Sequence, residues 1–158
     1  MDPHTSEKLR NVFKKGLIEG NGVWRIRDNL LKAFPELDPN QAAMIANTDL
    51  ALAENYGSCL GYLDGGINAV LVIDFGGCSI CGAVCGMIIS TKLAMLYPLH
   101  HAGCRRKFLP MLPSEYSHEE LDDKAFLAAV GQPEYESAED GRSIFKVQIH
   151  HCMAKGII

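Results

Sequence analysis

Four residues of the chain have the types and the spacing of ligands for one metal ion. Two cysteines are separated by two residues, and after a further 19 residues a histidine and a cysteine repeat that separation: Cys78, Cys81, His101 and Cys104. Two residues between ligands allow a tight turn to direct both donor atoms at one ion, and two such turns supply the four ligands of a closed zinc site. The pattern predicts a structural Zn²⁺, because a closed site keeps no position for a substrate.

Neighbouring residues leave other ligand sets open, as well as a site without metal. His100 could replace His101 as the imidazole ligand. Cys85 extends the Cys78–Cys81 pair toward an iron–sulfur motif, but no fourth cysteine has a known spacing, so we expect Cys85 to be a small core residue on a strand. A second, weaker group of metal-binding residue types lies near the C-terminus: His150, His151 and Cys152.

Three consecutive bases follow the second ligand pair: Arg105, Arg106 and Lys107. Beside a metal site they could contact phosphate. We expect instead a solvated surface, or a partner for the acidic segment that follows. The net charge of −4 and the absence of aromatic residues among these bases argue against a general polyanion-binding protein. A zinc-ribbon-like nucleic-acid-binding module is therefore the alternative function.

Composition and motifs argue against an enzyme and against a membrane protein. The 158 residues are 47% hydrophobic and 22% charged, which is typical of a globular protein. No phosphate-binding glycine loop, nucleophile elbow or HExxH motif is present. A thioredoxin-like use of Cys78 and Cys81 needs a helix that opens at the motif, within a βαβ unit, whereas we predict a strand after Cys81.

The distribution of apolar residues indicates the cellular environment. No apolar run reaches ~18 residues, and the N-terminus lacks the apolar stretch of a secretory signal. We therefore expect the chain to fold in a reducing cytoplasm. There its six cysteines would be metal ligands or buried thiols rather than disulfides.

Helical periodicity dominates the first part of the chain. Apolar residues at spacings of three and four predict helices over residues 5–18 and 23–34. A third helix has the strongest start signal, because Asp38 at the N-cap and Gln41 three residues later form a capping box. Gly65–Gly66 ends it.

Two polar residues of this third helix fall on its apolar side. Cys59 is expected to be buried. Asp49 lies on the same face as Ile45 and Leu52, so it needs a partner unless it sits at the solvated edge of that face.

The hydrophobic period changes after the third helix. Residues 69–75 are apolar and β-branched and predict a buried strand, and residues 86–90 predict a second. Together they predict a hairpin with cysteines in its loop. Residues 92–113 are expected to be mostly irregular, and a metal would hold such a long loop in place.

The acidic residues gather after this loop. Residues 114–140 contain nine acids and one base, Lys124, which predicts a domain boundary near residue 113. Residues 1–113 would form an α+β domain, with N-terminal helices packed on a small β-hairpin or sheet and a zinc-pinned loop. Residues 114–158 would form an acidic, helical appendage.

Two elements are predicted within this appendage. Ser117 and Glu120 form a second capping box and predict a helix to about Val130. A last strand is predicted over residues 143–150.

The ordered motifs resemble the phage head morphogenesis domain, the minor head protein family typified by the F protein of phage Mu. Members carry an Ile-Ala-Arg-Thr-Glu-like motif on a helix, then a strand pair with a Cys-x2-Cys turn, then a loop with a His-Pro-x-Cys-Arg-Cys-like motif. The chain has counterparts in the same order over about residues 5–113: Ile45–Asp49, Cys78–Cys81 and Pro98–Arg106. Four positions depart from the family motifs: Asn47, Asp49, Ala102 and Arg106.

This resemblance implies a minor structural protein that acts in head morphogenesis of a tailed phage or phage-like particle. Its partners would be the portal protein, the major capsid protein or both, and packaged DNA is a further candidate. The protein would be found in the host cytoplasm during assembly and in the head or portal region of the virion. The resemblance implies no membrane and no small-molecule substrate.

Overall fold

The computed structural model describes residues 3–74, 78–117, 119 and 121–131. In these residues the fold is α+β, as predicted, with helices packed on a small antiparallel sheet. The elements are, in chain order, α1 (Pro3–Ile18), α2 (Val23–Ala33), α3 (Pro39–Asp64), β1 (Ala69–Asp74), α4 (Ser79–Val84), β2 (Ile88–Ser90), α5 (Thr91–Leu96), β3 (Arg106–Met111) and α6 (Asp123–Val130).

The three N-terminal helices form where their periodicity predicts them. The capping box of α3 is confirmed: Asp38 Oδ1 accepts hydrogen bonds from the N–H groups of Asn40 and Gln41 at 2.8 and 3.0 Å, and the Gln41 side chain accepts from the Asp38 N–H at 3.1 Å. The first half of α3 packs with α1 and α2 around a core of its own, with Ile26 and Leu30 fully buried at its centre.

The sheet has the order β2-β1-β3, and both neighbours run antiparallel to β1. The predicted pairing of β1 with β2 is confirmed, but the loop between them contains the short helix α4. The expectation of an irregular segment over residues 92–113 is wrong, because it contains α5 and β3. Helix α5 is too short to show a clear period, and Lys107 and Pro110 interrupt the apolar pattern of β3.

Side chains cover both edges of the sheet. From α3, Asn55 and Tyr62 donate hydrogen bonds to carbonyl groups of β3 at 2.8 and 3.1 Å. Before and within α6, Asp122 and Asp123 accept from N–H groups of β2 at 2.9 and 2.7 Å. These bonds occupy some of the outward backbone groups of β2 and β3, so α3 and α6 partly cover the two edges of the sheet.

The second hydrophobic core is formed by residues of the sheet and of helices α3 to α6. Phe126 of α6 is fully buried, and its ring lies edge-on to Tyr97 with centroids 5.8 Å apart. Helix α6 therefore packs in the same core as β1, although it follows the predicted boundary at residue 113. That boundary stays a prediction. Helix α6 also begins at Asp123 rather than near Ser117. The strand predicted over residues 143–150 lies outside the described residues.

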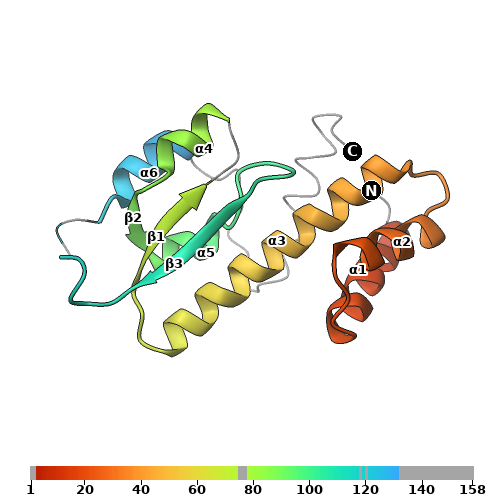
Figure 1. The fold of residues 1–158 in the computed structure, drawn as a ribbon, viewed down its shortest axis with the longest axis horizontal. Coiled ribbons are helices and arrows are strands. Elements are labelled where there is room, and N and C mark those ends of the chain that lie inside the picture. Colours follow the sequence, from red (N-terminus) through yellow and green to blue (C-terminus); the bar gives the residue numbers. More distant parts are fainter. Residues whose placement is uncertain (1–2, 75–77, 118, 120, 132–158) are drawn as a thin grey trace.

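Helix α3 connects the two cores. Figure 1 shows it as the long diagonal helix, with α1 and α2 at one end and the sheet with α4, α5 and α6 along the other. A third, smaller buried cluster lies between them and consists of Leu52, Cys81, Leu99 and Cys104. None of the described helices combines the length and hydropathy that crossing a bilayer requires.

Candidate metal centre

The first pair of predicted ligands lies at the start of α4. Cys78 occupies the N-cap position, and its Sγ accepts a hydrogen bond from the Cys81 N–H at 3.2 Å. The Cys-x2-Cys motif therefore opens a helix, and our expectation of a strand after Cys81 is wrong. The described sheet is antiparallel throughout, so it still lacks the parallel βαβ unit in which a thioredoxin-like motif sits.

The second pair lies in the loop between α5 and β3, and α3 holds this loop in place. Asn55 Nδ2 donates to the carbonyl groups of Pro98 and Arg106, both at 2.8 Å, so it spans the two ends of the loop. Nearer the ligands, the Gly103 N–H donates to Thr48 Oγ1 at 3.0 Å. Thr48 belongs to the helical motif Ile45–Asp49, so two of the ordered motifs are in direct contact.

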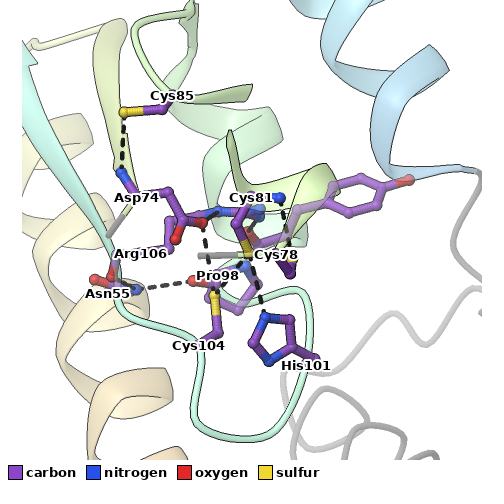
Figure 2. A network of polar contacts seen from close by, with 10 residues as sticks. Asn55, Asp74, Cys78, Cys81, Cys85, Pro98, His101, Cys104 and Arg106 are labelled. Carbon is purple, nitrogen blue, oxygen red and sulfur yellow. Dashed lines mark hydrogen bonds and ion pairs between the residues drawn. The ribbon is translucent and has the colours of Figure 1, made fainter. Parts of the chain in front are cut away.

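The buried thiol of Cys81 is the centre of the donor cluster. Its Sγ lies 3.3 Å from His101 Nε2 and 4.0 Å from Cys104 Sγ. The bond lengths of tetrahedral zinc imply ligand separations of about 3.5 Å between nitrogen and sulfur and about 3.8 Å between two sulfurs. Figure 2 shows these side chains converging from α4 and the loop. The structure therefore brings the predicted residues to metal-binding distances around Cys81.

The donors form two overlapping groups rather than one. Cys78, Cys81 and His101 have their donor atoms within 4.8 Å of one another, and so do Asp74, Cys81 and Cys104. One ion held by all four predicted ligands would need Cys104 to come closer to Cys78 and His101. The spacing of cysteines and histidines gives no indication of Asp74, which lies at the end of the apolar strand β1 and reaches the cluster through the pairing of β1 with β3.

Hydrogen bonding favours His101 over His100 as the imidazole donor. His101 Nδ1 lies 2.8 Å from the Ala102 carbonyl oxygen, which fits an Nδ1–H donor and leaves the Nε2 lone pair directed at the cluster. His100 belongs to neither donor group, and its ring lies edge-on to that of His101 with centroids 5.8 Å apart.

The two thiols of the Cys-x2-Cys motif differ in acidity. The hydrogen bond from the Cys81 N–H lowers the pKa of Cys78 to about 7. Burial raises the pKa of Cys81, and the Cys78 thiol, Cys104 and Asp74 add to this effect. Because metal binding requires thiolates, binding at Cys81 releases a proton that the isolated fold retains.

Two other cysteines lie outside these groups. Cys59 on α3 is fully buried, as expected, and burial raises its pKa to about 12. The expectation for Cys85 is wrong: it is exposed at the end of α4, where its Sγ accepts from the Asp74 N–H at 3.5 Å. It joins neither donor group, which leaves the iron–sulfur alternative without support. The group His150–Cys152 lies outside the described residues.

The three consecutive bases do not share a surface. Arg106 is fully buried and forms an ion pair with Asp74. Lys107 pairs with Glu54 of α3 on the exposed side of β3, and Arg105 is exposed. The interpretation of this triplet as one phosphate-binding or solvated patch is therefore wrong, because alternate residues of a strand point to opposite faces.

Asp49 lies inside the molecule rather than at a solvated edge. It is 4% exposed, and within the described residues its carboxylate has no hydrogen-bond or ion-pair partner. Burial raises its pKa to about 7.

Comparisons with protein-family models, with curated proteins and with solved structures found no match to this chain. The evidence on its function therefore comes from the donor cluster itself. A set of thiol, imidazole and carboxylate groups at these distances could hold a metal ion.

Proposed function

We propose that this chain is a non-catalytic assembly protein. One structural zinc ion would hold the start of α4 to the α5–β3 loop, beside the sheet. The role of the chain is that of a minor head protein of a tailed phage or phage-like particle, in contact with the portal or major capsid protein. The observation that carries the zinc proposal is the convergence of buried Cys81 and Cys104 with His101 from two separate segments.

The donor set supports a structural ion rather than a catalytic one. Cys78, Cys81, His101 and Cys104 would fill four coordination positions, which leaves none for a substrate or an activated water. The ligands come from the start of α4 and from the α5–β3 loop, so a bound ion would join two separate segments of the chain. Such an ion contributes directly to the free energy of folding.

The arrangement of the ordered motifs supports the assembly role. The helical motif Ile45–Asp49, the Cys-x2-Cys turn and the loop Pro98–Arg106 are the segments on which the resemblance to minor head proteins depends. In this fold they meet, because Thr48 binds Gly103 and Cys81 contacts His101. The ion would stiffen this junction, and the rigid unit would present its surfaces to partner subunits.

The nucleic-acid-binding alternative has less support. It relied on the basic triplet, but Arg106 is buried and Lys107 is paired with Glu54. Among the described residues, Arg105 is then the one exposed base of the triplet outside an ion pair, which is too little charge to bind a polyanion in a protein of net charge −4.

The metal content of the purified full-length chain tests the zinc proposal. We expect about one zinc per chain by elemental mass spectrometry, as for a four-ligand site. The Cys104→Ser variant should lose the zinc and melt at a lower temperature. Cys85→Ser, which changes an exposed cysteine outside both donor groups, is the matched control and should retain both zinc and stability.

Two results would contradict the zinc proposal. A Cys104→Ser protein with unchanged zinc and melting temperature would remove the four-ligand site. A metal-free wild-type protein with a Cys78–Cys81 disulfide would point to dithiol chemistry instead.

Co-sedimentation tests the assembly role. The chain is co-expressed with the portal and major capsid proteins of a tailed phage, and particles are separated on a density gradient. We expect the chain to travel with the particles, and Cys104→Ser to remain at the top of the gradient. Wild-type chain that stays at the top in the presence of assembled particles would refute the head-protein role while leaving the zinc site intact.

A further inference from the structure

A buried ion pair adjoins the donor cluster and has no part in the proposal above. Asp74 ends β1, Arg106 begins β3, and the two are direct partners in the strand register. Arg106 Nε donates to Asp74 Oδ2 at 3.2 Å, and both side chains are fully buried. A buried ion pair seldom stabilises a fold more than apolar residues of similar size would. Its presence here therefore suggests a role beyond stability.

The same carboxylate oxygen also faces the metal ligands. Cys104 Sγ donates to Asp74 Oδ2 at 3.7 Å, and the Asp74 carboxylate lies within 4.8 Å of both Cys81 Sγ and Cys104 Sγ. A carboxylate in this position is itself a competent zinc ligand. The cluster thus contains five candidate donors for an ion that takes four, and Asp74 and Cys104 are neighbours that could substitute for each other.

The guanidinium group of Arg106 is held firmly on Asp74. Arg106 Nη1 donates to the Tyr97 carbonyl at 3.2 Å, and the guanidinium carbon lies 5.3 Å from the centroid of the Phe126 ring. Among the completely buried side-chain polar atoms of the described residues, Arg106 Nη2 alone has no hydrogen-bond partner. Figure 2 shows Arg106 beside Asp74, Cys81 and Cys104. The guanidinium therefore places a positive charge directly beside the Asp74 carboxylate.

We propose that Arg106 determines which donors bind the ion. By holding Asp74 Oδ2 and neutralising its charge, Arg106 keeps this carboxylate out of the coordination shell and leaves the fourth position to Cys104. Without the guanidinium, the buried Asp74 carboxylate loses the positive charge that balances its own, and coordination of the cation would restore that balance. Asp74 then competes with Cys104, and the site changes from three thiolates to two. This inference rests on the proposed zinc site.

Cobalt substitution tests the inference, because the absorbance of sulfur-to-cobalt charge transfer reports the number of thiolate ligands. The full-length protein is loaded with Co²⁺ as wild type, Arg106→Gln, Asp74→Asn and the double variant. Glutamine keeps N–H donors without the charge. We expect Arg106→Gln to lose about a third of the charge-transfer absorbance, as one of three thiolates is replaced. Asp74→Asn and the double variant should keep the wild-type spectrum.

Lys107→Gln is the matched control, since it removes the next base of the same strand from an exposed ion pair, and its spectrum should not change. The double variant also covers the case in which Arg106→Gln does not fold, because replacing both partners of a buried pair is often tolerated. A wild-type spectrum for folded Arg106→Gln would overturn the inference. Loss of the sulfur-to-cobalt absorbance in the double variant, or in Asp74→Asn, would overturn it as well. Wild-type protein that binds no cobalt would instead contradict the zinc proposal itself.

Discussion

At the scale of single residues, burial decides the chemistry of this protein. Cys78 and Cys81 belong to one motif, yet the partly buried thiol of Cys78 is made more acidic by a backbone N–H and the buried thiol of Cys81 is made less acidic. Arg106 and Lys107 are adjacent bases, yet one is buried against Asp74 and the other lies on the surface. Asp49 is the buried group whose effect on stability is most directly measurable, because it has no partner among the described residues.

Asp49 predicts a pH dependence of stability that is the reverse of the usual one for an aspartate. Its pKa is 3.8 in the unfolded chain and about 7 in the fold. Between these values the folded state holds the extra proton, so the free energy of unfolding falls as the pH rises from about 4 to about 7. Asp49→Asn should therefore stabilise the protein at pH 8 relative to wild type and change it less at pH 5. The gain in the free energy of unfolding at pH 8 is a few kcal/mol at most, since one pKa unit corresponds to about 1.4 kcal/mol.

Urea unfolding at the two pH values measures this difference. Asp64→Asn on the same helix removes an exposed carboxylate and should not alter the dependence on pH. If the free energies of unfolding of Asp49→Asn and wild type differed by the same amount at pH 5 and pH 8, Asp49 would not be the cause of the pH dependence.

At the scale of elements, α3 organises the site although it supplies no ligand. Asn55 and Tyr62 cover the edge of β3, and Thr48 fixes the loop that carries His101. The loop itself depends on Gly103, whose φ is +73° and whose position a side chain would crowd. The left-handed conformation of Gly103 therefore belongs to the part of the loop that binds Thr48 of α3.

Gly103→Ala is expected to destabilise the protein by ~1–2 kcal/mol, the cost of a left-handed conformation in a residue with a Cβ. The new Cβ would also lie 3.1 Å from Met44 Sδ. Because this loop carries two ligands, zinc should also be lost more readily to a chelator. Thermal unfolding and chelator competition measure the two effects.

Gly57→Ala is the contrasting variant. Gly57 is an exposed position inside α3 with nothing within 4 Å of an added Cβ, so alanine there should stabilise the helix by roughly 0.5–1 kcal/mol. Equal effects of the two substitutions would show that the backbone of Gly103 does not constrain the loop.

At the scale of the whole molecule, two cores share one long helix. The core of α1, α2 and the start of α3 contains none of the candidate ligands, whereas the ligands border the core of the sheet. A metal ion would therefore stabilise one end of the molecule directly and the other only through α3. This division predicts that metal removal acts locally before it acts globally.

Hydrogen exchange with and without a chelator tests this division. After EDTA treatment we expect faster exchange in α4, in the α5–β3 loop and in β3, with little change in α1 and α2. Equal acceleration along the whole chain would mean that the two cores unfold as one unit. Unchanged exchange in every segment would mean that no metal supports the fold.

The sequence alone determined the elements whose signals are local. The capping box at Asp38, the period of α1 to α3 and the apolar run of β1 depend on residues within a few positions of one another, and so does the spacing of the four ligands. The tertiary structure decided what depends on contacts between distant residues. Strand β3 exists because it pairs with β1, and Asp74 meets Arg106 and Cys104 only through that pairing, across 32 and 30 positions of the chain. Short range patterns contain no information on such partners, because the free energy of a buried ion pair or an edge strand depends on what the rest of the fold places beside it.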